Sequence, residues 1–520
     1  MTISAPSPMT ASSPRPVSAS RTRAGTTAIL ALLCLAQFMV VLDVSIVNVA
    51  LPSIRHALGF SQTALQWVVN AYALTFAGFL LLGGRLGDLF GRRRVFLIGL
   101  SAFTASSFLC GVAPQEGVLI VARAVQGLSA ALLSPATLSL LTTTFPEGPE
   151  RTRAMGVWSA MAAAGGVAGA LISGVVTNYV SWRWIFFINV PIGLLALAAA
   201  RMVLAPDGST SERHRLDLFG ALIGTSGLVL LVYGITETAT HGWGSSRVLI
   251  PIAAGLLALS AFVIVERRVA AEPILPLGLF KIRSLSASNA AVFLVSSSMF
   301  ATWFFMTLYL QNVLGYDALR AGLAFVPSGL AVIAGTQLSS RLVGRVGMRV
   351  LLLAGPLIIA AGLLWFAQLP SRGSYAGHVL GPSVVTMLGF GMAFVPLTMS
   401  AVAGVPSNEA GIASGVFQTS RQVGGAIGLA ALASIAAART KAVLAAGPVT
   451  HDAVRTSLTA GYTRAFVLAA LVTSLAAVIG VLGARPASAA SSSRRDAMCA
   501  VVGALWHSGH QEPGASVQAR

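Results

Sequence analysis

An acidic residue inside a long apolar run is the first feature of this sequence that could do chemistry. Asp43 lies within "MVVLDVSIVNVALPSI" (39–54), a stretch of Val, Leu and Ile long enough to cross a membrane. A charge at that depth in a bilayer costs about 2.5 kcal/mol or more, so acids of this kind usually mark ion or proton pathways. The neighbours of Asp43 at helical spacing are all apolar, which favours a functional role over a structural one.

A second charge lies inside the apolar run "LIVARAVQGLSAALLSPA" (119–136). Arg123 shares one helical face with Gln126, Ala130 and Ser134, so that face is a stripe of polar and small residues. An Arg in this position requires a wet cavity or a carboxylate. The alternative is that Arg123 extends to the membrane interface, since it lies close to the predicted helix start.

The composition shows which elements must position these two charges. Of the 520 residues, 55% are hydrophobic and only 10% are charged, which is too few to cover a soluble protein of this size. The apolar residues cluster in blocks of about 20, the length of a membrane-spanning helix. Fourteen blocks can be distinguished. The sequence therefore predicts an all-α membrane protein with 14 transmembrane helices.

The net charge of +18 follows from topology. Most of the 34 Lys and Arg residues fall in the two tails and in alternate loops, as the positive-inside rule requires when both termini are cytoplasmic. A nucleic-acid partner is therefore not expected.

The chain contains an internal repeat. "RLGDLFGRR" (85–93) matches "RLVGRVGMR" (341–349), and "GVWSAMAAAGGVAG" (156–169) matches "GVFQTSRQVGGAIG" (415–428), at nearly the same offset. Two matches of this kind indicate a duplication, here a parallel pseudo-repeat in a 6 + 2 + 6 arrangement. The predicted organisation is a disordered tail (1–26), a six-helix half (27–204), a linker with two extra spans (205–280), a second six-helix half (281–484) and a cytoplasmic tail (485–520).

The loop "GGRLGDLFGRRR" (83–94) between the second and third predicted spans has features of a conformational latch. A lone acid among arginines at a helix end can bind a partner helix terminus or a basic side chain. The alternative is a solvated turn whose arginines only set the topology. The predicted latch residues are Gly84, Asp88, Gly91, Arg92 and Arg93, and the repeat copy has Gly344 in place of Asp88.

Other polar or small residues within the spans are candidates for a substrate cavity or a gate. The stripe "GGVAGALISG" (165–174) allows helices to pack backbone to backbone, and a gating role is a further hypothesis. The predicted cavity and gating residues are Gln37, Asn48, Gln66, Asn70, Gln126, Gly165, Gly169 and Arg421.

Several kinds of chemistry are not expected. A phosphate-binding loop requires Gly-Lys-Ser/Thr, which neither lysine provides, so ATP does not drive this protein. The three cysteines and the pair His507 and His510 do not form a metal-ligand pattern. We therefore expect no catalytic residues, no metal, no cofactor and no enzymatic activity.

Several of these motifs together resemble those of the major facilitator superfamily, in particular the fourteen-spanner drug:proton antiporter branch. The segments that carry the resemblance are "LDVSIVNVALPSI", "GRLGDLFGRR", "RAVQGLSAA", "SWRWIFFINVPIG", "YLQNVLGYDALRAGL" and "SRQVGGAIG". The sequence departs from the branch pattern in the fifth span, where Ala170 replaces a Pro and Ser173 replaces a Gly. The resemblance implies that Asp43 carries the proton and that Arg123 modulates it.

The implied function is export of amphipathic small molecules, such as drugs or antibiotics, in exchange for protons. The expected location is the bacterial plasma membrane, with lipid, substrate and protons as partners and a monomer as the functional unit. A dedicated exporter of one secondary metabolite, conferring self-resistance, would have a similar sequence. An uncoupled facilitator and a transport-inactive membrane sensor are the alternatives from other classes.

Overall fold

The computed structural model describes residues 23–61, 63–145, 149–206, 218–268, 275, 277–405, 409–446, 448 and 450–483. Within these ranges every regular element is a helix, as the predicted all-α membrane fold requires. The chain is rich in residues with high helix propensity such as Ala and Leu, and a backbone in lipid must satisfy its own hydrogen bonds.

Seven helices precede the predicted linker. They are α1 (Arg23–Leu58), α2 (Trp67–Phe90), α3 (Arg92–Val112), α4 (Glu116–Thr144), α5 (Pro149–Tyr179), α6 (Trp184–Phe187) and α7 (Asn189–Val203). Two long helices follow, α8 (Leu218–His241) and α9 (Ser246–Arg268). The rest are α10 (Arg283–Leu308), α11 (Ala318–Ala324), α12 (Val326–Val346), α13 (Met348–Phe366), α14 (Leu380–Val402), α15 (Ala410–Leu444) and α16 (His451–Gly483).

Thirteen helical runs in the described part of the chain are long and apolar enough to cross a membrane. Some runs combine two elements: α6 continues into α7, and α11 into α12. In addition to these thirteen, α5 has 31 residues and packs along α1. With α5 included, the order of the helices agrees with the fourteen spans expected from the sequence.

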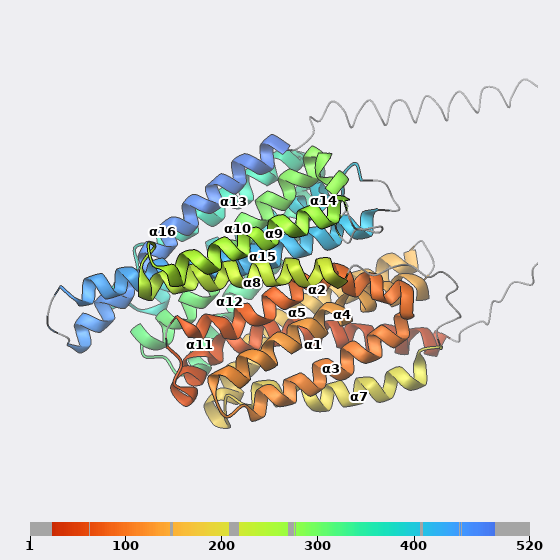
Figure 1. Ribbon diagram of the computed structural model, residues 1–520, viewed down its shortest axis with the longest axis horizontal. Coiled ribbons are helices and arrows are strands. Elements are labelled where there is room, and N and C mark those ends of the chain that lie inside the picture. The colour runs from red at the N-terminus through yellow and green to blue at the C-terminus, as the bar shows by residue number, and fades with distance from the viewer. Residues whose placement is uncertain are drawn as a thin grey trace, which may run out of the picture.

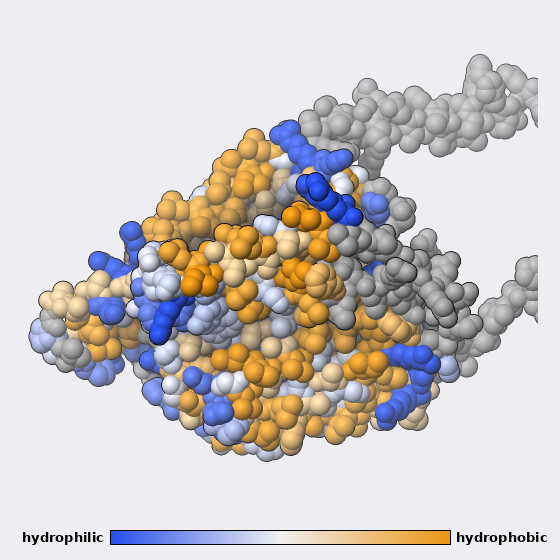
Figure 2. Space-filling view, in the orientation of Figure 1, coloured by the Kyte–Doolittle hydropathy of each residue, from blue (hydrophilic) through white to orange (hydrophobic). Residues whose placement is uncertain are grey.

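The helices form one elongated bundle (Figure 1). α1 to α7 lie in the lower part of the view and α10 and α13 to α16 mostly in the upper part, while α8 and α9 run along the front. α11 and α12 lie at the lower left, where they contact α5. α8 packs against both α2 and α15, and thus contacts both groups of helices. α1 begins and α16 ends toward the right of Figure 1, and we call this the terminal end of the bundle and the opposite one the far end. Hydrophobic side chains cover most of the visible face (Figure 2).

Small residues allow the helices to approach closely. A Cβ atom added at Gly83 would lie 2.1 Å from the carbonyl oxygen of Ala131, and one at Gly127 would lie 2.3 Å from that of Tyr72. Since real Cβ atoms do not approach so closely, α2 and α4 pack backbone to backbone. This packing brings Arg123 of α4 next to α2.

The internal repeat recurs in the packing. Gly165 of α5 faces the backbone of α1 at Phe38, and its repeat partner Gly424 of α15 faces the backbone of α10 at Phe293. Ser45 Oγ donates to the carbonyl of Gly166 at 2.5 Å, and Ser297 Oγ donates to that of Gly424 at 2.8 Å. The pairs α1–α5 and α10–α15 are therefore related in the way the duplication predicts. The boundaries 27–204, 205–280 and 281–484 stay predictions.

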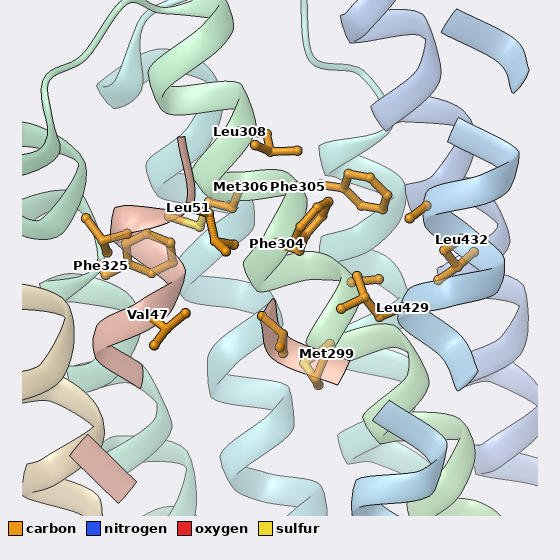
Figure 3. Close-up of a cluster of buried hydrophobic side chains, with 14 of the residues drawn as sticks. Val47, Leu51, Met299, Phe304, Phe305, Met306, Leu308, Phe325, Leu429 and Leu432 are labelled. Atoms are coloured by element: carbon orange, nitrogen blue, oxygen red, sulfur yellow. The ribbon is translucent and has the colours of Figure 1, made fainter. Parts of the chain in front are cut away.

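An apolar core joins the two groups of helices. Val47 and Leu51 of α1 belong to the same buried cluster as Met299 and Phe304 of α10. Figure 3 shows these side chains together with Phe325, which follows α11. Polar side chains in such surroundings need partners within the protein.

Candidate functional site

Asp43 and Arg123 form an ion pair in the interior of the bundle. Arg123 Nη1 lies 2.6 Å from Asp43 Oδ2, and both side chains are almost completely inaccessible to solvent. Asp43 comes from α1 and Arg123 from α4, 80 residues apart in the sequence. The structure thus brings together the two residues that the sequence predicts for proton coupling. It also excludes the alternative that Arg123 extends to the interface.

Two amide side chains complete the surroundings of the carboxylate. Gln126 Nε2 donates to Asp43 Oδ1 at 2.8 Å, and Asn189 Nδ2 donates to the same oxygen at 3.0 Å. The carboxylate therefore accepts three hydrogen bonds, which is the arrangement that an ionised acid requires in a buried site. We call Asp43, Arg123, Gln126 and Asn189 the Asp43 network.

The guanidinium of Arg123 is satisfied as well. Its Nε donates to the carbonyl oxygen of Val68 at 3.0 Å, and Nη1 also donates to Gln126 Oε1 at 2.7 Å. The ring of Tyr72 lies 4.4 Å from Arg123 Cζ, within the range of a cation–π contact. Arg123 therefore keeps three favourable contacts that do not depend on the charge of Asp43.

A second layer fixes the amides. Asn189 Nδ2 also donates to Ser107 Oγ at 3.1 Å, and Ser107 Oγ donates to the carbonyl of Phe186 at 2.9 Å. Cys110 Sγ lies 3.6 Å from Gln126 Oε1. Through these contacts the site joins α1, α2, α3, α4, α6 and α7.

Four residues of the site are not identified from the sequence: Asn189, Tyr72, Ser107 and Cys110. Asn189 lies within "SWRWIFFINVPIG", where an amide in an apolar segment was the available signal. Along α1 itself the neighbours of Asp43 are apolar, as the sequence indicates, and its polar partners come from other helices. Gln126, predicted as a cavity residue, lies on the carboxylate of Asp43.

The other predicted polar residues lie outside the Asp43 network. Asn48 Nδ2 donates to the carbonyl of Val44 in its own helix, and Gln66 Nε2 donates to Thr236 Oγ1 of α8 at 3.4 Å. Gln37 and Asn70 are buried, and neither Oδ1 nor Nδ2 of Asn70 has a hydrogen-bond partner in the described part of the chain. Their assignment to a substrate cavity stays a prediction.

Arg421 of α15 is the second Arg that the sequence predicts inside a span. Its Nε donates to Gln418 Oε1 at 2.8 Å. Among the described residues no carboxylate lies within ion-pair distance of it. Its role in substrate binding or gating stays a prediction.

Gly165 and Gly169 of α5 both face α1. A Cβ atom at Gly169 would lie 2.8 Å from Ser45 Cβ. Further along α5 the helix contacts α11 of the second group, where a Cβ at Gly174 would lie 2.7 Å from the carbonyl oxygen of Ala318. α5 is one continuous helix through Ala170. Packing by the small-residue stripe is thus observed, while a gating role for Gly165 and Gly169 stays a prediction.

The predicted latch lies at the junction of α2 and α3. Gly91 separates the two helices with φ of 95°, a conformation that favours glycine, and Gly347 has φ of 83° at the matching junction of α12 and α13. Gly84 lies in α2, and Arg92 and Arg93 begin α3, where Arg93 Nη2 is 3.5 Å from the carbonyl oxygen of Arg201. The side chain of Asp88 lies outside the described part of the structure, so the latch stays a prediction.

Comparison of the sequence with known proteins shows the family of this chain. The family model described as Major Facilitator Superfamily matches residues 33–429. The chain is 47% identical over 423 residues to the cephamycin export protein CmcT of Amycolatopsis lactamdurans, covering 81% of this chain and 87% of that protein. It is 41% identical over 453 residues to the puromycin resistance protein pur8 of Streptomyces alboniger, covering 86% and 90%. The chain belongs to the Major Facilitator Superfamily, and it is a membrane transporter rather than an enzyme.

Solved structures agree with the fold. A bacterial homologue of the human lysosomal transporter Spinster, in an inward-facing and unoccupied conformation, superimposes with a TM-score of 0.63. The match covers 89% of this chain and 98% of that chain at 15% sequence identity. At this identity the similarity supports the fold alone.

Proposed function

We propose that this protein exports amphipathic small molecules from the cell in exchange for protons, with Asp43 as the proton carrier. The observation that carries the proposal is the buried ion pair of Asp43 and Arg123, with 2.6 Å between Nη1 and Oδ2. A charge pair of this kind inside a membrane protein is costly to bury, and its usual role is in proton or ion transfer.

The proposed coupling follows from the hydrogen-bond inventory of the Asp43 network. In the observed arrangement the nearest neighbours of the carboxylate are donors, which suit the ionised form. A proton taken up at Asp43 removes the negative charge opposite Arg123 and leaves a buried cation unpaired. The loss of one partner from a buried pair is strongly destabilising, so protonation favours a different packing of α1 against α4.

Asn189 provides the acceptor that a protonated Asp43 needs. Its Oδ1 atom is buried and has no hydrogen-bond partner among the described residues. Rotation of the amide by half a turn would place Oδ1 next to the carboxyl group, where it would accept the new O–H donor. Asn189 is thus proposed to stabilise both protonation states by turning either its N–H or its carbonyl oxygen to Asp43.

Drugs and antibiotics are the proposed substrates. The relatives carry names that refer to cephamycin export, puromycin resistance, tetracenomycin C resistance and export, and lincomycin resistance. Because several of these names specify one antibiotic, a dedicated exporter that confers self-resistance is the second candidate. We place the protein in the bacterial plasma membrane as a monomer with both termini in the cytoplasm.

Transport into inverted membrane vesicles tests this proposal. A panel of puromycin, lincomycin, a cephamycin and ethidium is offered with and without an imposed proton gradient. Antiport predicts uptake of at least one compound that depends on the gradient and is lost in Asp43→Asn. The matched control is Thr104→Val, because Thr104 is buried in α3, keeps its size in this variant and donates a hydrogen bond to the carbonyl of Leu100 in its own helix. Uptake that ignores the gradient and persists in Asp43→Asn would establish an uncoupled facilitator instead.

A further inference from the structure

A pocket at the far end of the bundle lies apart from the Asp43 network. It has a volume of about 710 Å³ and lies between α2, α8 and α9. The volume falls within the range of about 300–1,000 Å³ that is typical of sites for small molecules. Hydrophilic side chains gather at the left ends of α8 and α9 (Figure 2). We call this cavity the α8–α9 pocket.

Two aromatic side chains form one wall of the pocket. Trp67 of α2 and Tyr233 of α8 have their ring centroids 6.5 Å apart with 45° between the ring planes. Tyr233 is 44% exposed, so its ring is accessible to a bound molecule. Aromatic faces attract cations and stack on other rings.

One acidic group, Glu237, lies beside these rings. His241 Nδ1 is 2.8 Å from Glu237 Oε2, and His241 Nε2 is 3.1 Å from Arg247 Nη1. A guanidinium can only donate, so Nε2 is the acceptor in the contact with Arg247. His241 Nδ1 also lies 2.8 Å from Thr240 Oγ1, so Thr240 and Glu237 are its two neighbours. No Lys or Arg of the described residues lies within ion-pair distance of Glu237.

The floor of the pocket leads to buried amides. Thr236 lines the pocket and accepts a hydrogen bond from Gln66 Nε2. Three buried amide atoms have no hydrogen-bond partner in the described part of the chain: Gln66 Oε1, and Oδ1 and Nδ2 of Asn70 one turn further along α2. Buried polar atoms of this kind are normally satisfied by water or by a ligand. The pocket therefore combines aromatic faces with the carboxylate of Glu237 and the guanidinium of Arg247, and buried amides without a partner lie behind Thr236.

We infer that the α8–α9 pocket is a binding site for amphipathic aromatic cations, in which Glu237 pairs with the positive charge and Trp67 and Tyr233 stack on the ring system. Two helices that have no counterpart in the six-helix repeats build most of this site, which gives the inserted pair a function. A role of this site in binding molecules during export rests on the proposed function. The binding of aromatic cations to the pocket does not.

Protection of an introduced thiol by a cationic dye tests the inference on the purified full-length protein. Cys499 is replaced by Ser, and Cys34 and Cys110 are left in place because both are buried. Ser246→Cys then places a thiol in the pocket wall at the start of α9, and Trp243→Cys places an exposed control thiol on the preceding loop, outside the pocket. Ethidium is expected to slow maleimide labelling of Ser246→Cys and to leave that of Trp243→Cys unchanged.

The same assay tests the role of the Glu237 charge and the independence of the pocket from Asp43. The ethidium concentration for half protection should rise about tenfold in Glu237→Gln, since loss of a charge-assisted contact is worth about one decade of affinity. It should not change in Glu116→Gln, an exposed acid in the first turn of α4, or in Asp43→Asn. Loss of transport in Asp43→Asn with intact protection would therefore separate the two proposals. Equal protection by the anionic dye anilinonaphthalene sulfonate, or unchanged protection in Glu237→Gln, would overturn the inference.

Discussion

At the scale of the residue, the protein keeps two opposite charges in its interior, and each has several partners besides the other charge. Asp43 accepts from Arg123, Gln126 and Asn189, and Arg123 contacts Val68 and Tyr72 as well. Asp43, Arg123 and Gln126 could be found from the sequence, because each is a polar residue in an apolar run. Asn189 was not identified, because it is 146 residues from Asp43 and no local spacing links them.

Removal of the amide of Asn189 should weaken proton coupling without loss of the fold. Asn189→Leu deletes one hydrogen bond to a charged acceptor, which is worth about 1.5–3 kcal/mol. We expect the gradient-driven transport rate to fall about tenfold or more, because Asn189 is proposed to hold Asp43 in both protonation states. Transport in inverted vesicles with an imposed proton gradient measures this rate. A rate identical to that of the wild type would exclude a role for Asn189.

Loss of the aromatic face over Arg123 should have a smaller effect. Tyr72→Leu removes a cation–π contact of about 1–2 kcal/mol for a desolvated pair, while the ion pair stays intact. The expected result is a lower unfolding temperature in detergent with proton-dependent transport retained. Tyr72→Phe keeps the ring and serves as the control, since the hydroxyl has no partner among the described residues. An equal loss of stability in both variants would contradict this account.

At the scale of the element, the helices are positioned by small residues, and both copies of the repeat use the same contacts. Gly165 and Gly424 face α1 and α10 in equivalent ways. The charged site is present in one copy only, since the stretch of α10 that Gly424 and Gly428 face, residues 293–297, contains no acid. The repeat and the latch glycines could be read from the sequence. The contact of α5 with α11 could not, because it joins small residues that have no distinctive pattern.

A larger side chain at the contact of α5 with α11 should separate the two groups of helices. A Cβ at Gly174 would lie 2.7 Å from the carbonyl oxygen of Ala318, and one at Gly322 would lie 2.6 Å from that of Ala170. Gly174→Val should therefore destabilise this packing by about 1–3 kcal/mol. Gly166→Ala is the matched control on the same helix, because a Cβ there meets nothing within 4 Å. The unfolding temperature in detergent should be lowered in Gly174→Val and unchanged in Gly166→Ala. Equal unfolding temperatures of the two variants would refute the prediction.

Substitution of Gly91, between α2 and α3, should also lower the stability of the protein, here because of backbone conformation. Gly91 has φ of 95°, so Gly91→Ala introduces backbone strain of about 1–2 kcal/mol even where there is space for the side chain. Gly117→Ala is the control, since Gly117 lies within α4 and a Cβ there has open space. Unfolding temperatures of the two variants measure the difference. If Gly91→Ala is as stable as Gly117→Ala, backbone conformation does not explain this glycine.

At the scale of the whole molecule, the all-helical membrane fold follows from composition and from the length of the apolar runs, as the sequence predicts. α8 packs against both α2 and α15, and so the inserted pair lies along both groups of helices. Gly78 of α2 makes this contact possible, because a Cβ there would lie 2.0 Å from Thr225 Oγ1 of α8. Which helices contact one another across the bundle depends on three-dimensional packing, which hydropathy and spacing do not contain.

Proton movement driven by substrate tests the central claim most directly. The protein is reconstituted into liposomes that contain a pH-sensitive dye, and the panel compound with the fastest export is added on one side. Substrate should drive a proton flux in the opposite direction in the wild type and in Thr104→Val, and this flux should fall to the level of empty liposomes in Asp43→Asn. A proton flux of wild-type size in Asp43→Asn would contradict the assignment of Asp43 as the proton carrier.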